Sequence, residues 1–262
     1  MKAENAAQGD RQLEDRDFVA SLEKGLAVIE AFDASRSRLT LTDVSKLTGT
    51  TRAAARRYLR TLVRLGYAEF DGRFFSLTPR ILRLGYAYLA SAPMPARLQP
   101  FLEKISDETG ESSSAAMLDG DEVVYIARSA TRRIMSIGLG VGSRLPAYCT
   151  SLGRALLSCR SDPEIEAYLD RVRLEPRTPF TVTDRERLLA ALRETREQGY
   201  SVINEELEIG LRSIAVPVRQ ENGSARIAIN VSTQAGRVSP AEMAERFLPA
   251  LQAAGRAIRY TL

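Results

Sequence analysis

The chain has 262 residues, enough for one large domain or two of ordinary size, and its 44% hydrophobic and 27% charged residues are the balance of a globular protein that buries a core. Its net charge of +4 is unevenly distributed, because residues 1–17 sum to −2, residues 18–91 to +6 and residues 92–262 to zero. No stretch approaches the ~20 apolar residues of a membrane helix, and the polar N-terminus lacks the apolar segment of a secretory signal, which excludes a transmembrane protein.

The residue types that are rare or absent exclude several classes of catalytic and metal site. The sequence contains no histidine, which excludes Ser–His and Cys–His nucleophiles, histidine-ligated metals and histidine-based pH switches. Cys149 and Cys159 are the only cysteines and make no disulfide framework, which fits a reducing cytoplasm. We therefore expect a cytoplasmic protein with no metal and no cofactor.

The residues up to 79 predict a winged helix–turn–helix domain. Residues 1–17 have few large apolar groups and predict a disordered tail, outside the domain of residues 18–79. Apolar residues at helical spacing predict three helices: about 21–33 capped by Ser21, 41–47 capped by Thr40 or Thr42, and about 51–65 capped by Thr50. Two short strands, 67–70 and 73–77, flank a turn at Asp71-Gly72. This order of elements is that of a winged helix–turn–helix.

Residues 80–94 predict a linker helix that contacts a second copy of the chain. The helix covers 80–91, and Pro93 and Pro95 mark its end and the domain boundary. It carries more large apolar side chains than a short solvated helix needs: Ile81, Leu82, Leu84, Tyr86, Tyr88 and Leu89. We expect a homodimer, and the sequence leaves open whether two such dimers form a dimer of dimers.

The second part of the chain, 95–262, predicts strands joined by short turns with helices between them. The predicted helices are 96–109, 150–159, 163–170, 184–198 with a Thr183–Glu186 capping box, and about 240–260 opened by Ser239-Pro240. The predicted strands are 112–118, 122–129, 133–138, 200–204, 212–218 and 225–232. Strands paired by hairpins predict an α+β domain with a largely antiparallel sheet.

The helix at 51–65 has the composition of a DNA-recognition helix. Its small first residues allow close approach to a groove, and residues 50–66 hold five arginines and no acid. Arg52 and Arg56 lie four residues apart, so we expect them to share a face opposite Leu59 and Leu62 and to pair with guanine. Arg57 and Arg60, with Arg73 in the wing, suit phosphates. The candidate DNA contacts are Thr50, Thr51, Arg52, Ala53, Arg56, Arg57, Arg60 and Arg73. A basic surface helix of an unrelated small domain is the alternative.

The last two predicted strands alternate between large apolar and small or polar residues. Ile214, Val216 and Val218 share one face, as do Ile227, Ile229 and Val231, and this face predicts a core. The other face carries Ser213, Asn230 and Ser232, which would either border a ligand cavity or be merely solvated.

A glycine-rich segment, Gly138-Leu-Gly-Val-Gly142, precedes the second candidate group. Its spacing fits neither a dinucleotide fingerprint nor a Walker motif, so we expect a loop that passes close to a ligand. Arg144 and the helix start at Ser151 could hold a carboxylate, and an ordinary surface arginine is the alternative for Arg144. Cys149 has no histidine to activate it, and a small buried thiol is the better interpretation.

Five segments of the chain resemble the IclR family of bacterial transcription regulators. They are residues 21–32 (SLEKGLAVIEAF), 41–49 (LTDVSKLTG), 51–62 (TRAAARRYLRTL), 144–156 (RLPAYCTSLGRAL) and 205–215 (EELEIGLRSIA). The resemblance runs from about residue 18 to the end. It is strongest to the subgroup that regulates aromatic-acid catabolism through the β-ketoadipate pathway, at 51–62 and at 133–135.

The resemblance implies a dimeric winged helix–turn–helix that binds a promoter or operator and a GAF-like effector domain at 95–262. Effector-binding residues of such sensors match Ser151, Ser213, Asn230 and Ser232, with acidic residues near 204–206. With Arg144, and with Glu205 from that acidic segment, the candidate effector contacts are Arg144, Ser151, Glu205, Ser213, Asn230 and Ser232. We expect the effector to be a small carboxylate, an aromatic or β-keto acid.

Two other functions stay open on the sequence. An acyl-transfer or hydrolytic domain using Ser151 or Cys149 could be fused to the DNA-binding module. A structural DNA-binding protein with a dimerisation domain is the third possibility. Turnover of aromatic acids would favour the enzyme, and DNA affinity independent of any ligand would favour the structural protein.

Overall fold

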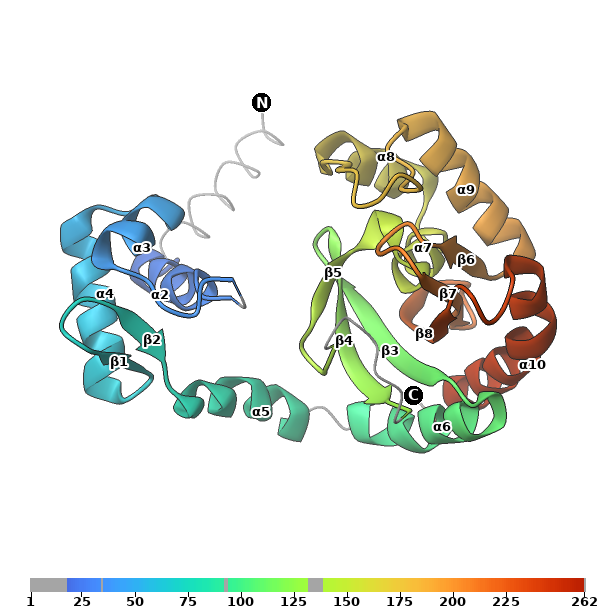
Figure 1. Ribbon diagram of the computed structural model, residues 1–262, viewed down its shortest axis with the longest axis horizontal. Coiled ribbons are helices and arrows are strands. Elements are labelled where there is room, and N and C mark those ends of the chain that lie inside the picture. The colour runs from blue at the N-terminus through green and yellow to red at the C-terminus, as the bar shows by residue number, and fades with distance from the viewer. Residues whose placement is uncertain (1–17, 34, 92–93, 132–138, 262) are drawn as a thin grey trace, which may run out of the picture. The chain divides into compact units, whose positions relative to one another are not determined.

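The computed structural model describes residues 18–33, 35–91, 94–131 and 139–261. The chain forms two compact units, Met1–Tyr88 and Leu89–Leu262 (Figure 1). The predicted disordered tail and the predicted strand at 133–138 lie outside the described residues. Among the helices of the described ranges, none is long and apolar enough to cross a bilayer.

The first unit has the predicted order of a winged helix–turn–helix. Its elements are α2 (Ala20–Glu30), α3 (Leu41–Leu47), α4 (Arg52–Leu65), β1 (Ala68–Phe70), β2 (Phe75–Leu77), η1 (Pro79–Ile81) and α5 (Leu82–Ser91). Val28 of α2, Val44 of α3 and Leu59 of α4 are completely buried in one core with Phe75 of β2. Leu39 pairs with Phe75 across an isolated bridge and so adds a third extended segment to the hairpin.

Helix caps in this unit differ from the sequence expectation by one or two residues. Thr40 caps α3 in a capping box with Asp43, as one of the two candidates predicted. The cap of α4 is Thr51 rather than Thr50, and its hydroxyl accepts from the Ala54 N–H at 3.2 Å. Thr51 takes this role because its backbone is extended, the conformation of an N-cap, whereas the Thr50 hydroxyl is hydrogen-bonded inside the turn. Helix α2 begins after Val19 without a side-chain cap, so the Ser21 cap was also wrong.

The wing loop is longer than the predicted two-residue turn. Phe70 pairs with Phe75, which leaves four residues, 71–74, between the strands. The Asp71 carboxylate accepts from the N–H groups of Arg73 and Phe74 at 2.9 and 2.8 Å. An Asp side chain that closes its own turn replaces the tighter Asp-Gly hairpin.

The second unit is an α+β domain built on a six-stranded sheet. Its helices are α6 (Met94–Thr109), η2 (Ala147–Cys149), α7 (Ser151–Leu157), α8 (Asp162–Arg171), α9 (Arg185–Gln198) and α10 (Pro240–Arg259). Its strands are β3 (Ser112–Asp119), β4 (Glu122–Ser129), β5 (Arg144–Pro146), β6 (Ser201–Asn204), β7 (Leu211–Arg219) and β8 (Ala225–Gln234). The strand order is β5-β4-β3-β8-β7-β6, and every neighbouring pair is antiparallel, as predicted. The short β5 was not predicted, and Asp184 rather than Thr183 caps α9.

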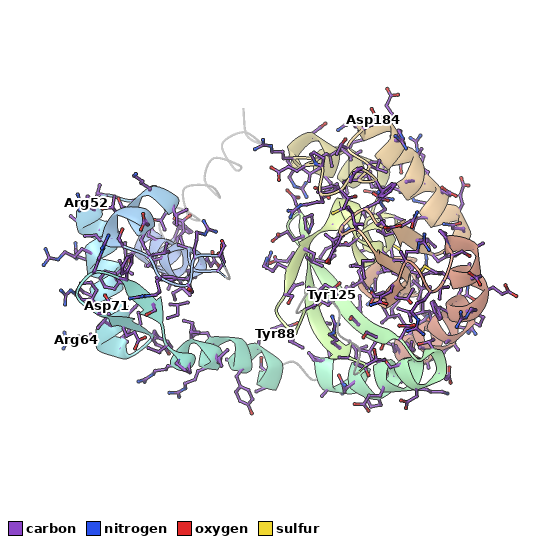
Figure 2. The ribbon with its side chains drawn as sticks, in the orientation of Figure 1. Arg52, Arg64, Asp71, Tyr88, Tyr125 and Asp184 are labelled. Carbon is purple, nitrogen blue, oxygen red and sulfur yellow. The ribbon has the colours of Figure 1, made fainter. Side chains whose placement is uncertain are left out.

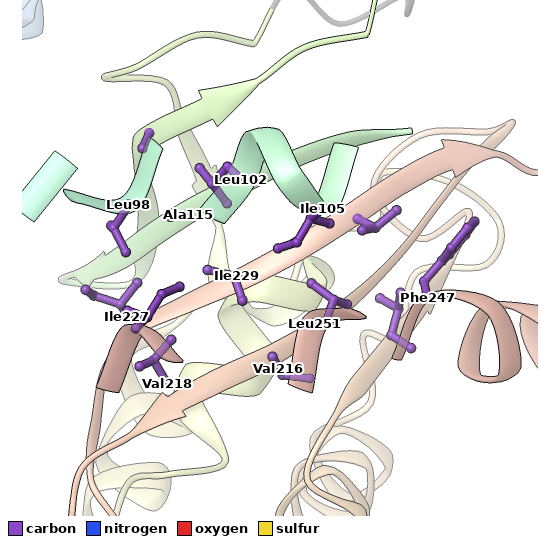
Figure 3. Packing of buried hydrophobic residues seen from close by; sticks show 14 of the residues in the cluster. Leu98, Leu102, Ile105, Ala115, Val216, Val218, Ile227, Ile229, Phe247 and Leu251 are labelled. Carbon is purple, nitrogen blue, oxygen red and sulfur yellow. The ribbon is translucent and has the colours of Figure 1, made fainter. Parts of the chain in front are cut away.

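Helices cover both faces of this sheet. On one face α6 and α10 pack against the predicted apolar rows of β7 and β8 (Figure 3). Leu102 of α6 and Leu251 of α10 are completely buried there. On the other face α7, with α8 and α9 behind it, buries the small residues Ala215 and Ala228. The small-residue face is therefore a second core beneath α7 rather than a solvated surface.

Candidate DNA interface and effector cavity

The exposed surface of α4 is a row of arginines. Its five arginines are all exposed, and Arg52 and Arg64 mark its two ends (Figure 2). Across the described ranges, the side chains of Arg52, Arg56, Arg57 and Arg64 have neither an ion-pair nor a hydrogen-bond partner. These guanidinium groups are thus available to an external anion, and phosphate is the anion that a groove-binding helix meets.

The buried side of α4 shows which arginines point outward. Ala55, Leu59 and Leu62 are its buried residues. At about 100° per residue, Leu59 lies only about 20° around the helix from Arg52, and Arg57 lies nearly opposite the buried side. Arg52 and Arg56 do share a side, being about 40° apart, but the expectation that this side is opposite Leu59 and Leu62 was wrong. Arg57 is at the centre of the exposed face, and Arg56 is at its flank.

Aromatic rings position the basic residues around the wing. The guanidinium of Arg73 lies 5.0 Å from the centre of the Phe74 ring, and that of Arg38 lies 4.9 Å from the same ring. Arg38 also pairs with Asp71. The guanidinium of Arg60, on α4, lies 5.1 Å from the centre of the Phe70 ring. Cation–π contacts of this kind hold a flexible cation in place while leaving its donors free for phosphate oxygens.

The other predicted DNA contacts are small residues at the start of α4. Ala53 is exposed and adds no bulk to the surface. Thr51 uses its hydroxyl as the helix cap, and the Thr50 hydroxyl lies 2.8 Å from that of Thr48. Their hydroxyls therefore shape the turn, and only their backbone and methyl groups are left for a groove.

In the second unit a cavity of about 370 Å³ opens on the α7 side of the sheet, within the size range of small-molecule sites. Its described lining comes from five parts of the chain: Tyr125, Leu139, Cys149, Thr150, Ser151, Ile203, Leu207, Glu208, Ile209, Gly210, Leu211, Ser213, Asn230, Ser232, Gln234 and Gly236. Four of the six predicted effector contacts, Ser151, Ser213, Asn230 and Ser232, are brought together in this lining. Asn230 is 2% exposed, which excludes a merely solvated face.

Two buried polar atoms of the lining lack a partner. Counting the described residues only, Ser151 Oγ and Asn230 Oδ1 form no hydrogen bond. The Asn230 Nδ2 group donates to Ser232 Oγ at 3.1 Å, which fixes the orientation of the amide. Leaving a buried donor or acceptor unpaired costs about 1–3 kcal/mol. A ligand that donates to Asn230 and bonds to Ser151 would recover this cost.

Arg144 and Glu205 do not line the cavity. The Arg144 side chain is 44% exposed and pairs with Asp119 and Glu122, each at 2.7 Å, because β5 lies beside β4. It is the surface arginine of the alternative interpretation. Among the described lining residues there is no lysine or arginine.

Glu205 instead shapes the loop that borders the cavity. Its backbone adopts a left-handed φ of 59°, and its carboxylate accepts from the Gly210 N–H at 2.9 Å. That bond closes the loop 205–211, from which Leu207 to Leu211 line the cavity. Glu205, predicted as a ligand contact, is therefore not among the described lining residues, whereas the loop that it closes is.

A buried ion pair joins the same loop to α7. Arg154 donates to Glu206 at 2.6 Å and to the Tyr148 carbonyl at 2.8 Å, and Glu206 also accepts from the Val182 N–H. Both charged side chains are less than 10% exposed. The pair belongs to two of the segments that resemble a known family, so those segments meet at the cavity wall.

The thiol in the lining is not an activated nucleophile. Burial raises the pKa of Cys149 to about 11, so the thiol stays protonated at neutral pH. Burial likewise raises the pKa of Tyr125 to about 12. Both groups present neutral polar atoms to the cavity, which suits binding rather than nucleophilic attack.

Several residues that line the cavity were not among the effector contacts predicted from the sequence. Gln234 continues the alternation of Asn230 and Ser232, so the strand period could have found it. Leu139 belongs to the glycine-rich segment 138–142, which was expected to pass near a ligand, although Leu139 was not itself named as a contact. Tyr125 joins the lining only because β4 reaches β8 through β3, and no local pattern contains that pairing.

Comparisons with known proteins match both units. Residues 21–72 match the IclR helix-turn-helix domain, and residues 86–260 match the bacterial transcriptional regulator IclR C-terminal domain. The chain is 49% identical over 249 residues to the Pca regulon regulatory protein of Pseudomonas putida, covering 95% of this chain and 86% of the relative. It is 39% identical over 254 residues to the p-hydroxybenzoate hydroxylase transcriptional activator of Acinetobacter baylyi, covering 95% and 93%.

A solved structure with a bound ligand resembles the second unit. It is a double mutant of the inducer-binding domain of the PobR transcription factor from Acinetobacter, in complex with 3-hydroxybenzoic acid. The two chains share 33% identity with a TM-score of 0.62, covering 65% of this chain and all of that one.

Proposed function

Because the chain belongs to the IclR family of bacterial transcriptional regulators, we propose that its first unit binds promoter or operator DNA and its second unit senses a small aromatic carboxylate. The observation that carries the sensing role is the pair of unpartnered buried atoms, Ser151 Oγ and Asn230 Oδ1, at one cavity of ligand size. A regulator of this kind acts where the DNA is, in the bacterial cytoplasm.

An aromatic ring fits the composition of the cavity. Leu139, Ile203, Leu207 and Leu211 supply apolar contacts, and Tyr125 supplies an aromatic one. Hydrogen-bonding groups come from β7 and β8 and from the start of α7, which suits a ring with polar substituents. The names of the relatives support this class, since one activates a p-hydroxybenzoate hydroxylase gene and one was solved with 3-hydroxybenzoic acid.

For DNA, we propose that Arg57 and Arg52 read bases and that Arg56, Arg60 and Arg73 hold phosphates. Arg57 is at the centre of the exposed face of α4, and Arg52 lies at the N-terminal end that enters a major groove first. A guanidinium pairs with guanine O6 and N7 in a fork, whereas flanking cations meet the backbone.

The proposed assembly is a homodimer that uses α5. Four large apolar side chains of this short helix are exposed: Leu82 at 70%, Leu84 at 47%, Tyr86 at 69% and Tyr88 at 47%. Apolar side chains gathered on one helix favour a protein partner, and a dimer doubles the number of DNA half-sites. Sedimentation of the full chain at micromolar concentration should give a dimer or a pair of dimers, and a monomer would contradict this assembly.

An enzymatic role is less well supported. The Cys149 thiol is protonated at neutral pH, and Ser151 Oγ has no base beside it among the described residues. A hydrolase or acyltransferase would need one of the two activated.

A thermal-unfolding screen of the full chain tests the sensing role. The panel contains 4-hydroxybenzoate, 3-hydroxybenzoate, 3,4-dihydroxybenzoate and β-ketoadipate. A ligand at 100 times its Kd should add about 2.7 kcal/mol of stability and raise the unfolding temperature. Stabilisation by a hydroxybenzoate supports the proposal. Stabilisation by β-ketoadipate alone, or by none of the four, contradicts an aromatic effector.

A further inference from the structure

One arginine of the sheet stands on the cavity face without a partner. Arg128 of β4 pairs with Ser114 of β3, and Ser114 pairs with Asn230 of β8. Residues directly opposite in antiparallel strands put their side chains on the same face of the sheet. Arg128 is therefore in the same row, and on the same face, as the cavity residue Asn230.

Only small side chains lie between Arg128 and Asn230 on this face of the sheet. Two strand spacings separate their backbones, about 10 Å. The residue between them, Ser114, is small, as are its neighbours on the same face, Ser112 and Ala116. Tyr125, three residues before Arg128 in β4, lines the cavity. The positive charge of Arg128 acts to lower the pKa of Tyr125, against the larger effect of burial.

Among the described residues, no hydrogen bond or ion pair is found for the guanidinium of Arg128. Its Nε is buried and has no hydrogen-bond partner in the described ranges. Three other arginines of the same unit do have partners: Arg144, Arg154 and Arg212 each pair with a carboxylate. A buried donor of a charged group without a partner is more costly than a neutral one, so the unpaired Nε in the same cross-strand row as the cavity residue Asn230 points to an external anion.

We propose that Arg128 is the carboxylate-binding residue of the effector cavity. This assignment rests on the proposed sensing of aromatic carboxylates. A buried carboxylate needs a charge-assisted partner, and the described lining contains the acidic Glu208 but no lysine or arginine. The guanidinium of Arg128 donates two parallel hydrogen bonds to the carboxylate. The far end of the ligand then meets Asn230 and Ser151.

Calorimetric titration of the full chain with two matched compounds tests the assignment. The compounds are 4-hydroxybenzoate and its neutral amide, 4-hydroxybenzamide, which share ring and hydroxyl. In Arg128→Gln the affinity for the acid should fall about 100-fold, while the affinity for the amide changes by less than about threefold. Arg128→Lys keeps the charge without the fork and should lie between the wild type and Arg128→Gln. Arg144→Gln, which removes a surface-paired arginine, is the control and should bind both compounds as the wild type does.

The outcomes separate this assignment from the proposed function. If the wild type binds the acid and Arg128→Gln binds it equally well, the assignment is overturned and aromatic sensing stands. If Arg128→Gln loses acid and amide in the same proportion, Arg128 supports the shape of the cavity and the assignment is also overturned. If the wild type binds neither hydroxybenzoate nor any other aromatic acid of the panel, aromatic sensing fails, and the assignment fails with it.

Discussion

Arginine is used differently in the two units. On α4, Arg57 and Arg64 are exposed and have no partner among the described residues. In the effector unit Arg154 and Arg144 hold carboxylates of the chain itself. Arg128 differs from these two, since its Nε is buried without a hydrogen-bond partner among the described residues and it shares a cross-strand row with the cavity residue Asn230.

This comparison distinguishes arginines that stabilise the fold through internal ion pairs from arginines that have no internal partner and can bind a ligand. An exposed guanidinium stays hydrated, so lack of a partner on α4 costs little and is informative only because five arginines gather without an acid. A buried guanidinium loses hydration and has to be paired. The unpaired state of Arg128 is therefore the stronger indication of a ligand, although it is a single residue.

The largest expected effect comes from breaking a paired arginine. Arg154→Met leaves Glu206 buried without its cation and should destabilise the effector unit by about 3–5 kcal/mol. Arg57→Ala, on the free surface of α4, should change stability by no more than about 0.5 kcal/mol. Denaturant unfolding of the full chain measures both. An equal loss of unfolding free energy in the two variants would contradict the distinction between arginines that stabilise the fold and arginines that are free to bind a ligand.

The second effect concerns the polar side of the cavity. Asn230→Ala combined with Ser232→Ala removes two hydrogen-bonding groups of about 0.5–1.5 kcal/mol each, so affinity for 4-hydroxybenzoate should fall by about 1–3 kcal/mol. DNA binding without effector should be unchanged. Ser224→Ala, in the β7–β8 turn, is the control and should bind as the wild type does. Calorimetry that finds the same affinity in the double variant would move the site elsewhere.

A third effect divides the α4 surface itself. Arg57→Ala should lose about 1–3 kcal/mol of binding free energy for the selected duplex and should discriminate less at one or two base pairs. Arg60→Ala should weaken all sequences alike and lower the salt slope by about 1. Titrations against a duplex selected from a random library, and against a scrambled duplex, measure both. If Arg56→Ala rather than Arg57→Ala relaxes specificity, the helix meets DNA on a different face.

The smallest effect comes from a buried thiol. Since burial raises the pKa of Cys149 from 9.0 to about 11, the unfolded chain loses this proton at lower pH than the folded chain. The stability tied to this proton is complete well below pH 9 and is lost as pH rises through 11, with about 1.4 kcal/mol gone by pH 10. Cys149→Ala should therefore show a shallower loss of stability between pH 9 and 11. Identical slopes would mean that the thiol ionises freely in the folded chain.

The sequence predicted what depends on neighbours along the chain. Most helices and strands followed from local periodicity, and the alternation of β7 and β8 placed Ser213, Asn230 and Ser232 on one face. The helical period also predicts that Arg57 points outward, whereas the four-residue spacing of Arg52 and Arg56 shows only that those two share a side.

What depends on pairing across the sheet was not predictable. Arg144 looked available for a ligand because its partners, Asp119 and Glu122, lie on a hairpin that becomes its neighbour only when β5 pairs with β4. Arg128 was not predicted as a site residue for the converse reason. Its place beside the cavity exists only through the register that joins β4, β3 and β8.

The reciprocal effect of DNA and effector tests the account most directly. The affinity of the full chain for its selected duplex is measured with and without saturating 4-hydroxybenzoate, and the affinity for 4-hydroxybenzoate with and without saturating duplex. An effector-responsive regulator predicts that each ligand changes the other's Kd by the same factor, about fivefold or more. If both ligands bind and neither Kd changes, the cavity does not control DNA binding, and the account is contradicted.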